Sequence, residues 1–314
     1  MKYLFGPINS RRLGISLGVD LVPFKTCSMD CVYCECGATT DLTIERREYV
    51  PTADVISELD SYLGDAPAID VITFSGSGEP TLHSGIGDVI RFLKEHYPKY
   101  RIVVLTNGSL FWMEDVRKAV HDADILVPSL DAATERGVAD INRPADGITA
   151  ERIVEGLIAL RREFSGEIRL EVFIVPGMND SDTEIHALKQ ACEAIRPDSI
   201  QLNTLDRPGT VETVRKASAD TIARITEMLH PLPVEVIGKP DYSRDVSPIR
   251  GDIDESIIRT LTRRPSTSDD LAKSLDVRTT EVIKILARMI DEGRIEEKVQ
   301  ERGTFYCLRH TEQP

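Results

Sequence analysis

Three cysteines near the amino terminus lie close enough in sequence to hold a metal centre. Cys27, Cys31 and Cys34 have the spacing CxxxCxxC, and they are half of the six cysteines in the chain. Thiolates are soft ligands that suit iron–sulfur clusters and zinc. Three protein ligands leave one iron of a [4Fe–4S] cube open to a substrate or cofactor. The triplet therefore predicts one redox-active cluster with an open coordination position.

A zinc site or three unrelated thiols are the alternatives. Zinc sites usually add a second ligand pair farther along the chain. Here Cys192 and Cys307 stand alone, and no two of the six histidines have H-x₃₋₅-H spacing. Six cysteines in 314 residues are also too sparse for a disulfide scaffold. The cluster is the interpretation that the spacing favours.

Glycine and polar residues follow several predicted strands, where they can contact a ligand. Gly76, Ser77, Gly78 and Glu79 follow one strand, and Asn107 follows the next. Glycines let a backbone approach a ligand closely, and exposed carbonyls accept hydrogen bonds from an ammonium group. Ser129 and Asp131 lie two residues apart at the end of a further strand, so they share a face and can bond ribose hydroxyls. Strand-ending turns and helix caps would explain the same residues.

The elements that must position these residues alternate between strands and helices. Strands are expected near residues 15–21, 69–74, 101–105, 124–130, 168–175 and 199–205, and amphipathic helices near 53–62, 85–97, 113–121, 149–164, 182–195 and 219–229. This order predicts an α/β fold with a parallel sheet, arranged as a partial (β/α)6 barrel, and a doubly wound sheet is the alternative. In either fold, ligands bind at the carboxyl ends of the strands.

The pattern changes after about residue 240. Residues 241–251 contain turn-forming residues and are expected to be a linker. Residues 252–314 then predict three helices and a two-stranded hairpin, the order of a small winged helix-turn-helix domain. Such a domain can bind DNA through its third helix. Its 11 Lys and Arg against 13 Asp and Glu, a net charge of −2, favour contact with protein or substrate instead.

The cysteine spacing resembles that of the radical S-adenosylmethionine (SAM) superfamily, with Tyr33 as the aromatic residue before the last cysteine. The segment Gly76–Glu79 resembles the Gly-Gly-Glu motif of that superfamily, with Ser77 in place of a glycine. The resemblance implies that SAM is the cofactor and that Tyr33, Gly76–Glu79, Asn107, Ser129 and Asp131 contact it. It also implies that the reduced cluster cleaves SAM to a 5′-deoxyadenosyl radical, with a flavodoxin- or ferredoxin-like reducing partner.

A narrower resemblance covers about residues 5–240, which sets a domain at 1–240. Strings such as Ile141-Asn142-Arg143-Pro144 and Val175-Pro176-Gly177 are similar to those of wyosine-type tRNA base synthases and their relatives. Those synthases carry a second cysteine set that is missing here, so one cluster is expected. The substrate is unidentified, and a macromolecule such as tRNA or protein is one option. An iron–sulfur sensor or transcription regulator is the alternative function.

The composition of the chain restricts its expected partners and cellular location. The net charge is −14, which disfavours broad contact with nucleic acid. No apolar run is long enough for a membrane span, and the amino terminus lacks the apolar stretch of a secretory signal, so a cytoplasmic location is expected. Cys36 could be an alternative cluster ligand or a hydrogen-atom donor, but a free cysteine is more often a small buried apolar residue, and that interpretation is favoured. Lys25 and Lys239 are lysines that could form a Schiff base if desolvated.

Overall fold

The computed structural model shows an open parallel sheet flanked by helices. It describes residues 2–10, 12–238, 253–275 and 277–309. Eight strands form one sheet in the order β1-β2-β5-β6-β7-β8-β9-β10. From β2 onward, each strand pairs in parallel with the next strand in the sheet. The order of the strands does not reverse along the sheet, whereas a doubly wound sheet reverses at its switch point. The α/β fold with a parallel sheet is therefore confirmed, and its winding is that of a partial barrel.

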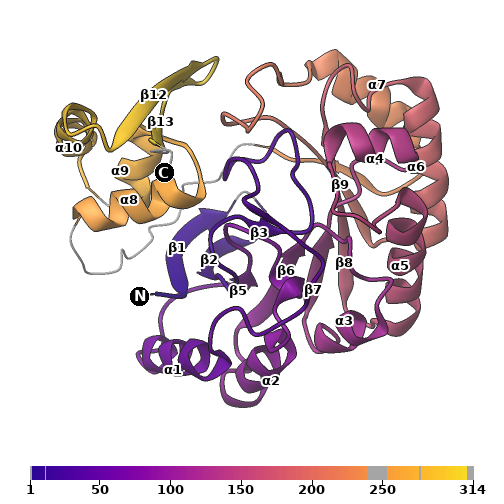
Figure 1. The fold of residues 1–314 in the computed structure, drawn as a ribbon, viewed down its shortest axis with the longest axis horizontal. Coiled ribbons are helices and arrows are strands. Elements are labelled where there is room, and N and C mark those ends of the chain that lie inside the picture. Colours follow the sequence, from indigo (N-terminus) through magenta and orange to yellow (C-terminus); the bar gives the residue numbers. More distant parts are fainter. Residues whose placement is uncertain (1, 11, 239–252, 276, 310–314) are drawn as a thin grey trace.

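All six predicted strands are present. They are β2 (Gly14–Val19), β5 (Val71–Phe74), β6 (Arg101–Thr106), β7 (Ile125–Pro128), β8 (Glu167–Ile174) and β9 (Ser199–Thr204). The six predicted helices are α1 (Thr52–Leu63), α2 (Ile86–His96), α3 (Glu114–Ala119), α5 (Ala150–Glu163), α6 (Asp182–Ile195) and α7 (Ala219–Leu229). Figure 1 shows these helices around the outside of the sheet. Four of the helix amino termini, at Thr134, Thr149, Ser181 and Ser218, are capped by their own hydroxyl groups, as serine and threonine favour.

Alternate residues of the strands pack on opposite faces of the sheet. Ile72, Phe74 and Val104 belong to the large hydrophobic core that the outer helices complete. Val71 and Val103 belong to a smaller cluster on the other face, which Leu13 joins from the turn between β1 and β2. The inner face of the barrel therefore carries an apolar cluster across β5, β6 and β7.

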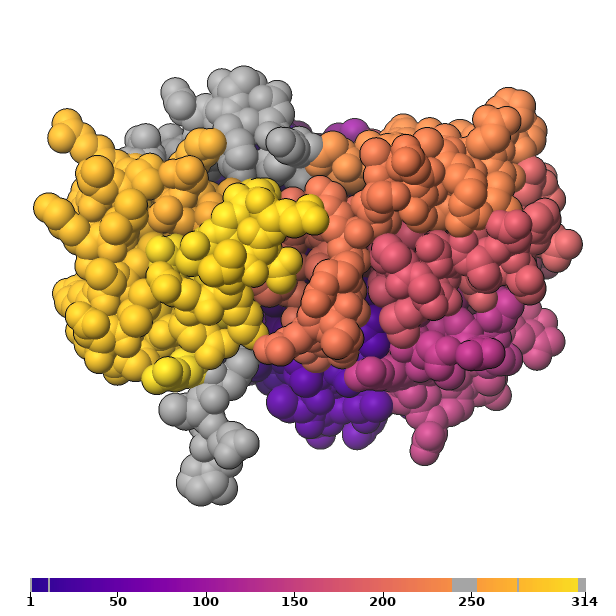
Figure 2. Space-filling view, turned by 90° about the horizontal axis from the view of Figure 1, so that it is seen from above, coloured from indigo at the N-terminus to yellow at the C-terminus, as the bar shows by residue number. Residues whose placement is uncertain are grey.

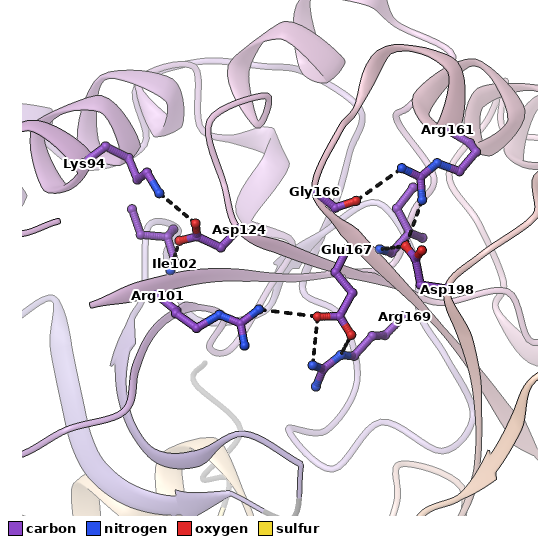
Figure 3. A network of polar contacts seen from close by, with 10 residues as sticks. Lys94, Arg101, Ile102, Asp124, Arg161, Gly166, Glu167, Arg169 and Asp198 are labelled. Atoms are coloured by element: carbon purple, nitrogen blue, oxygen red, sulfur yellow. Dashed lines mark hydrogen bonds and ion pairs between the residues drawn. The ribbon is translucent and has the colours of Figure 1, made fainter. Parts of the chain in front are cut away.

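The amino ends of the strands are also held by a network of ion pairs (Figure 3). Asp124 accepts bonds from Lys94 (2.7 Å) and the Ile102 amide (2.7 Å), and Glu167 pairs with Arg169 at 2.7 Å. These residues lie at the opposite end of the strands from the predicted ligand site. In a (β/α) fold, residues at this end serve stability.

Several elements of the barrel domain were not predicted from the sequence. Strand β1 (Leu4–Ser10) pairs antiparallel with β2, and the short β10 (Val234–Val236) pairs with β9. Helix α4 (Glu135–Ile141) separates β7 from α5. Two further short strands, β3 (Thr26–Cys27) and β4 (Asp41–Leu42), bracket the cysteine loop, and a 3-10 turn, η1 (Pro80–Leu82), follows the Glu79 region.

The carboxyl-terminal residues form a second, smaller hydrophobic cluster around Ile257, Leu271, Val282 and Leu286. Its elements are α8 (Ile253–Arg263), β11 (Ser266–Thr267), α9 (Ser268–Leu275), α10 (Thr279–Asp291), β12 (Ile295–Gln300) and β13 (Gly303–Leu308). The three strands form one sheet in the order β11-β13-β12. We call residues 253–309 the C-terminal module. The predicted linker at 241–251 and Lys239 lie outside the residues that the structure describes.

Candidate metal and cofactor site

The three cysteines lie on a loop that begins at β3, on the side of the sheet where the strands end. The loop has little secondary structure of its own, and a segment after α4 holds it by backbone hydrogen bonds. The Asp30 amide donates to the Asn142 carbonyl, and the Val32 amide donates to the Ile141 carbonyl, both at 2.9 Å. The Ala145 amide returns a bond to the Ser28 carbonyl at 2.9 Å. Residues 141–145 therefore form the frame that fixes the cysteine loop.

Each of the three sulfurs faces a nitrogen donor. Lys25 Nζ donates to Cys34 Sγ at 3.1 Å, and Asn142 Nδ2 lies 3.5 Å from Cys31 Sγ. Asn107 Nδ2 lies 3.6 Å from Cys27 Sγ and also donates to Ser28 Oγ at 2.9 Å. Donors aimed at sulfur stabilise negative charge on a thiolate and tune iron–sulfur centres. The donor set therefore fits a thiolate-bound cluster.

The spacing of these side chains does not suit a single metal ion. In the part of the chain that the structure describes, no three His, Cys, Asp or Glu side chains converge as ligands of one ion would. A cube of four irons holds its cysteine ligands at separate corners, so its sulfurs need not converge. The separate positions of the three sulfurs are therefore compatible with a cluster.

The thiols differ in how readily they ionise when no metal is bound. Burial, and then the carboxylate of Glu79, raise the pKa of Cys27 to about 12. The contact with the Cys36 thiol, together with the Lys25 ammonium, lowers the pKa of Cys34 to about 6. Lys25 itself is buried, with its backbone at a φ of 57°. The loop thus keeps a fixed positive charge beside one of its three sulfurs.

The turn after β5, residues 75–79, packs directly on the cysteine loop. A side chain at Gly78 would place its Cβ 2.0 Å from the Thr26 carbonyl oxygen. The Glu79 amide donates to that same oxygen, and the Lys25 amide donates to the Ser77 carbonyl, both at 3.1 Å. Gly78 is therefore required for this close approach. We call residues 75–79 the cofactor turn.

Glu79 is fully occupied by protein contacts. Its side chain is 2% exposed, and Oε1 accepts hydrogen bonds from Thr81 Oγ1 and Thr106 Oγ1, both at 2.6 Å. Oε2 accepts from the Asn107 amide at 2.7 Å. Burial raises the pKa of Glu79, and these donors oppose that rise. The residue joins the ends of β5 and β6, and its contact with a cofactor remains a prediction.

Asp131 has a similar position on the opposite side of the loop. Oδ1 accepts from the Phe173 amide at 2.9 Å, and Oδ2 accepts from Asn142 Nδ2 at 2.7 Å and Tyr33 Oη at 2.5 Å. The Tyr33 ring stacks on Phe173 with centroids 3.9 Å apart. Burial raises the pKa of Asp131 to about 6, although these donors lower it. Tyr33 and Asp131 thus fasten the cysteine loop to β8.

The remaining predicted residues differ in their surroundings. Asn107 reaches the cysteine loop, while its Oδ1 accepts from the Ser109 amide at 3.0 Å. Ser129 is half-buried, and its hydroxyl forms no hydrogen bond with a residue that the structure describes. The predicted residues therefore gather around the loop, but most of their polar atoms face protein.

Two residues at the sulfurs were missed as site residues. Lys25 was considered only for Schiff-base chemistry, yet it contacts Cys34 Sγ. Asn142 connects Cys31 Sγ with Asp131 and is 4% exposed. The only indication in the sequence was that Asn142 lies in the string at residues 141–144, which is similar to a string in wyosine-type tRNA base synthases. The role of Asn142 depends on a contact between positions 111 residues apart.

Comparisons with known families and relatives show to which family this chain belongs. A family model described as the radical SAM superfamily matches residues 21–188. A UPF0026 protein of Helicobacter pylori is 30% identical over 310 residues, which is 98% of both chains. A UPF0026 protein of Methanocaldococcus jannaschii is 29% identical over 312 residues, 98% of this chain and 96% of the relative. A protein of Brachyspira hyodysenteriae named GTPase Obg is 33% identical over 98% of this chain, but the chain spans only 45% of its length.

Solved structures show the same fold at lower identity. A radical SAM methyltransferase from Sphaerobacter thermophilus superposes with a TM-score of 0.53 at 19% identity, covering 70% of this chain and 65% of that one. SuiB of Streptococcus suis, bound to S-adenosylmethionine, gives a TM-score of 0.53 at 16% identity over 70% of this chain and 50% of that one. At these identities the likeness concerns the fold alone. Among the described residues, no helix is long and apolar enough to cross a membrane.

Proposed function

We propose that this chain holds one [4Fe–4S] cluster on Cys27, Cys31 and Cys34 and cleaves SAM there. The chain belongs to the radical SAM superfamily and to one family with the UPF0026 proteins, and this membership is the basis of the proposal. Cys27, Cys31 and Cys34 would hold the cluster, which when reduced would supply one electron for cleavage of the carbon–sulfur bond of SAM to methionine and a 5′-deoxyadenosyl radical. The observation that carries the proposal is that each of the three sulfurs faces its own nitrogen donor.

The donors have a defined task in this proposal. Lys25 balances negative charge at Cys34, while the amides of Asn107 and Asn142 do so at Cys27 and Cys31. Neither amide can lose its proton to a sulfur, so both stay donors in every redox state. Asp131 fixes the direction of the Asn142 amide, and the Ser109 amide fixes that of Asn107.

The cofactor turn and the strand ends are the proposed SAM site. Gly78 brings backbone close to the cysteine loop and Gly76 lies against Asp20, with Ser77 between them. The Ser129 hydroxyl, which forms no hydrogen bond with a described residue, is a candidate donor to the cofactor. Glu79, Tyr33 and Asp131 act mainly by holding these groups in place, since their polar atoms already have protein partners. The substrate must approach from the same side of the sheet.

The finer assignments also belong to the proposal. We place this chain near the wyosine-type branch, as a single-cluster enzyme in the cytoplasm that takes electrons from a flavodoxin- or ferredoxin-like partner. We propose domains at 1–240 and 252–314, joined by a linker at 241–251. The order of helices and strands after residue 253 supports a winged helix. That domain would contact a macromolecular substrate, such as tRNA or protein.

Anaerobic reconstitution tests the proposal. The reconstituted protein is expected to absorb near 400 nm and, with dithionite and SAM, to release 5′-deoxyadenosine and methionine in equal amounts. Cys27→Ala, Cys31→Ala and Cys34→Ala should each lose the absorption and the products. Cys307→Ala on β13, outside the triplet, is the control that should keep both. Binding of a specific DNA by an intact cluster protein that leaves SAM uncleaved would favour the sensor alternative instead.

A further inference from the structure

The C-terminal module reaches the cysteine loop itself. Cys36, two residues after the last cluster cysteine, donates through Sγ to the carbonyl oxygen of Arg263 at 2.9 Å. Arg263 is the last residue of α8, and this helix also packs on β1. Figure 2 shows the yellow module lying against the orange segment that follows β9, with indigo amino-terminal residues below the junction. The module is thus part of the wall around the loop.

The side chain of Arg263 extends from α8 to the barrel. Its guanidinium lies over the Phe5 ring, 4.5 Å from the centroid, and its Nη2 is 3.4 Å from Asp20 Oδ2. Both partners of this ion pair are largely buried, with side-chain exposures of 16% and 8%. A cation stacked on an aromatic ring and paired with a carboxylate is held in one direction. Arg263 is therefore fixed against Asp20.

Asp20 in turn holds the cofactor turn. Its Oδ2 accepts from Ser77 Oγ at 3.1 Å and from the Ser77 amide at 3.3 Å. Gly76 lies directly on the same carboxyl group, since a Cβ there would be 2.3 Å from Asp20 Cγ, and its φ of +143° suits only glycine. A displacement of the Asp20 carboxylate must therefore displace Gly76 and Ser77.

A second set of ion pairs joins the module to the barrel through other residues. Arg207 pairs with Glu35, the residue after Cys34, at 3.1 Å. Arg302 of the module contacts both Asp270 at 2.7 Å and Asp206 at 3.6 Å, and Asp206 precedes Arg207 in the chain. Arg207 and Asp270 are buried. Two ionic contacts, Arg263–Asp20 and Arg302–Asp206, therefore join the module to the barrel.

The Asp20–Arg263 pair is costly to break. Removing one partner of a buried pair leaves the other charge without compensation, which destabilises the surrounding structure. Asp20 Oδ1 and Arg263 Nε are buried and form no hydrogen bond with a described residue, so the contact between Arg263 Nη2 and Asp20 Oδ2 is the ionic compensation that each group gives the other. Loss of Arg263 should therefore loosen Asp20 and, with it, the turn that Asp20 holds.

We propose that Arg263 is a positioning residue, through which the docked C-terminal module sets the cofactor turn by way of Asp20. The inference rests on the proposed function insofar as residues 75–79 bind SAM. It makes the module a structural part of the cofactor site. A partner or substrate that bound the module and shifted α8 would therefore change the affinity of the protein for SAM. By thermodynamic linkage, SAM would change the affinity for that partner by the same free energy.

Hydrogen exchange of the full-length, cluster-free protein tests the coupling without any catalysis. Amide exchange over residues 75–79 should rise about tenfold in Arg263→Ala and in the isosteric Asp20→Asn, because the bonds that protect the turn are weakened. Arg263→Lys keeps the charge and should restore most of the protection. Arg288→Ala removes a guanidinium whose ion-pair partners, Asp254 and Glu292, lie within the module, and should leave the turn unchanged.

Binding of SAM to the reconstituted protein gives the second measurement. Arg263→Ala and Asp20→Asn should raise the Kd for SAM by about tenfold at full iron content, and the double variant should be no worse than either single one. Unchanged exchange over residues 75–79 in Arg263→Ala, with faster exchange only in the module, would overturn the coupling. A wild-type protein that never cleaves SAM would refute the proposed function but leave the exchange result to decide the coupling.

Discussion

Gly78 offers the sharpest test of how the cofactor turn packs on the cysteine loop. Its φ lies in the ordinary negative range, so Gly78→Ala adds no backbone strain and changes only the space that the residue fills. The new methyl carbon would lie 2.0 Å from the Thr26 carbonyl oxygen and 2.7 Å from Val22 Cγ2. The nearest neighbour is backbone, one residue before Cys27, and cannot rotate away.

The size of the destabilisation in Gly78→Ala follows from the parts of the chain that have to move apart. Relieving an overlap of more than 1 Å requires the turn and the loop to separate, and overpacking of this kind costs about 1–3 kcal/mol. The separation also breaks the bond from the Glu79 amide to the Thr26 carbonyl, a loss of about 1–2 kcal/mol. Together these effects should lower the free energy of unfolding by about 2–5 kcal/mol. For a chain of 314 residues the Tm should therefore fall by about 3–8 °C.

Thermal unfolding of the cluster-free protein measures the effect, and iron content after reconstitution shows whether the loop can still hold its cluster. Gly238→Ala is the control, because no described atom lies within 4 Å of the position where its Cβ would be. The control should unfold as the wild type does and bind the same iron. A Gly78→Ala protein with wild-type Tm and full iron would refute the packing of the turn on the loop.

Two further substitutions test the contacts of buried carboxylates. Asn142→Leu removes a donor from both Cys31 Sγ and Asp131 Oδ2, so the unfolding free energy should fall by about 1–3 kcal/mol and reconstituted iron should decrease; wild-type values of both would contradict the contacts. Burial raises the pKa of Asp270, but the two hydrogen bonds from Arg302 and its charge lower the pKa by more than burial raises it. The net result is a pKa of about 2, below the ordinary value of 3.8. Because the folded state binds this proton less readily, the pair stabilises fully above about pH 4 and loses its contribution as the pH falls towards 2. Arg302→Leu should therefore cost about 1 kcal/mol at pH 7, after allowance for solvent screening, and the difference in urea unfolding should shrink below pH 3; a constant difference would contradict the pairing.

The sequence was sufficient for most of the sheet. The buried strands are β-branched runs bounded by turns, and the helices between them have apolar residues at helical spacing, as in α2. The elements it missed lack such signals. Helix α4 has seven residues with a glycine at its third position, and β1 contains Gly6-Pro7, both of which disfavour a regular element in isolation. Each is stabilised by tertiary contacts instead.

The candidate site was predictable only in part. Cysteine spacing is local, so the triplet could be found from sequence. Whether Glu79 and Asp131 face a ligand or the protein depends on partners such as Thr106 and Phe173, tens of residues away. The bond from Cys36 to Arg263 joins positions 227 residues apart, and no local pattern predicts it.

The central claim is that three cysteines hold a cluster whose remaining iron is open to SAM. Electron paramagnetic resonance of the dithionite-reduced, reconstituted protein tests this claim most directly, with spectra recorded before and after SAM is added. Binding of SAM at an open iron predicts a clear change in the g-values of the wild-type cluster. An intact reduced cluster whose spectrum is identical with and without saturating SAM would contradict the account.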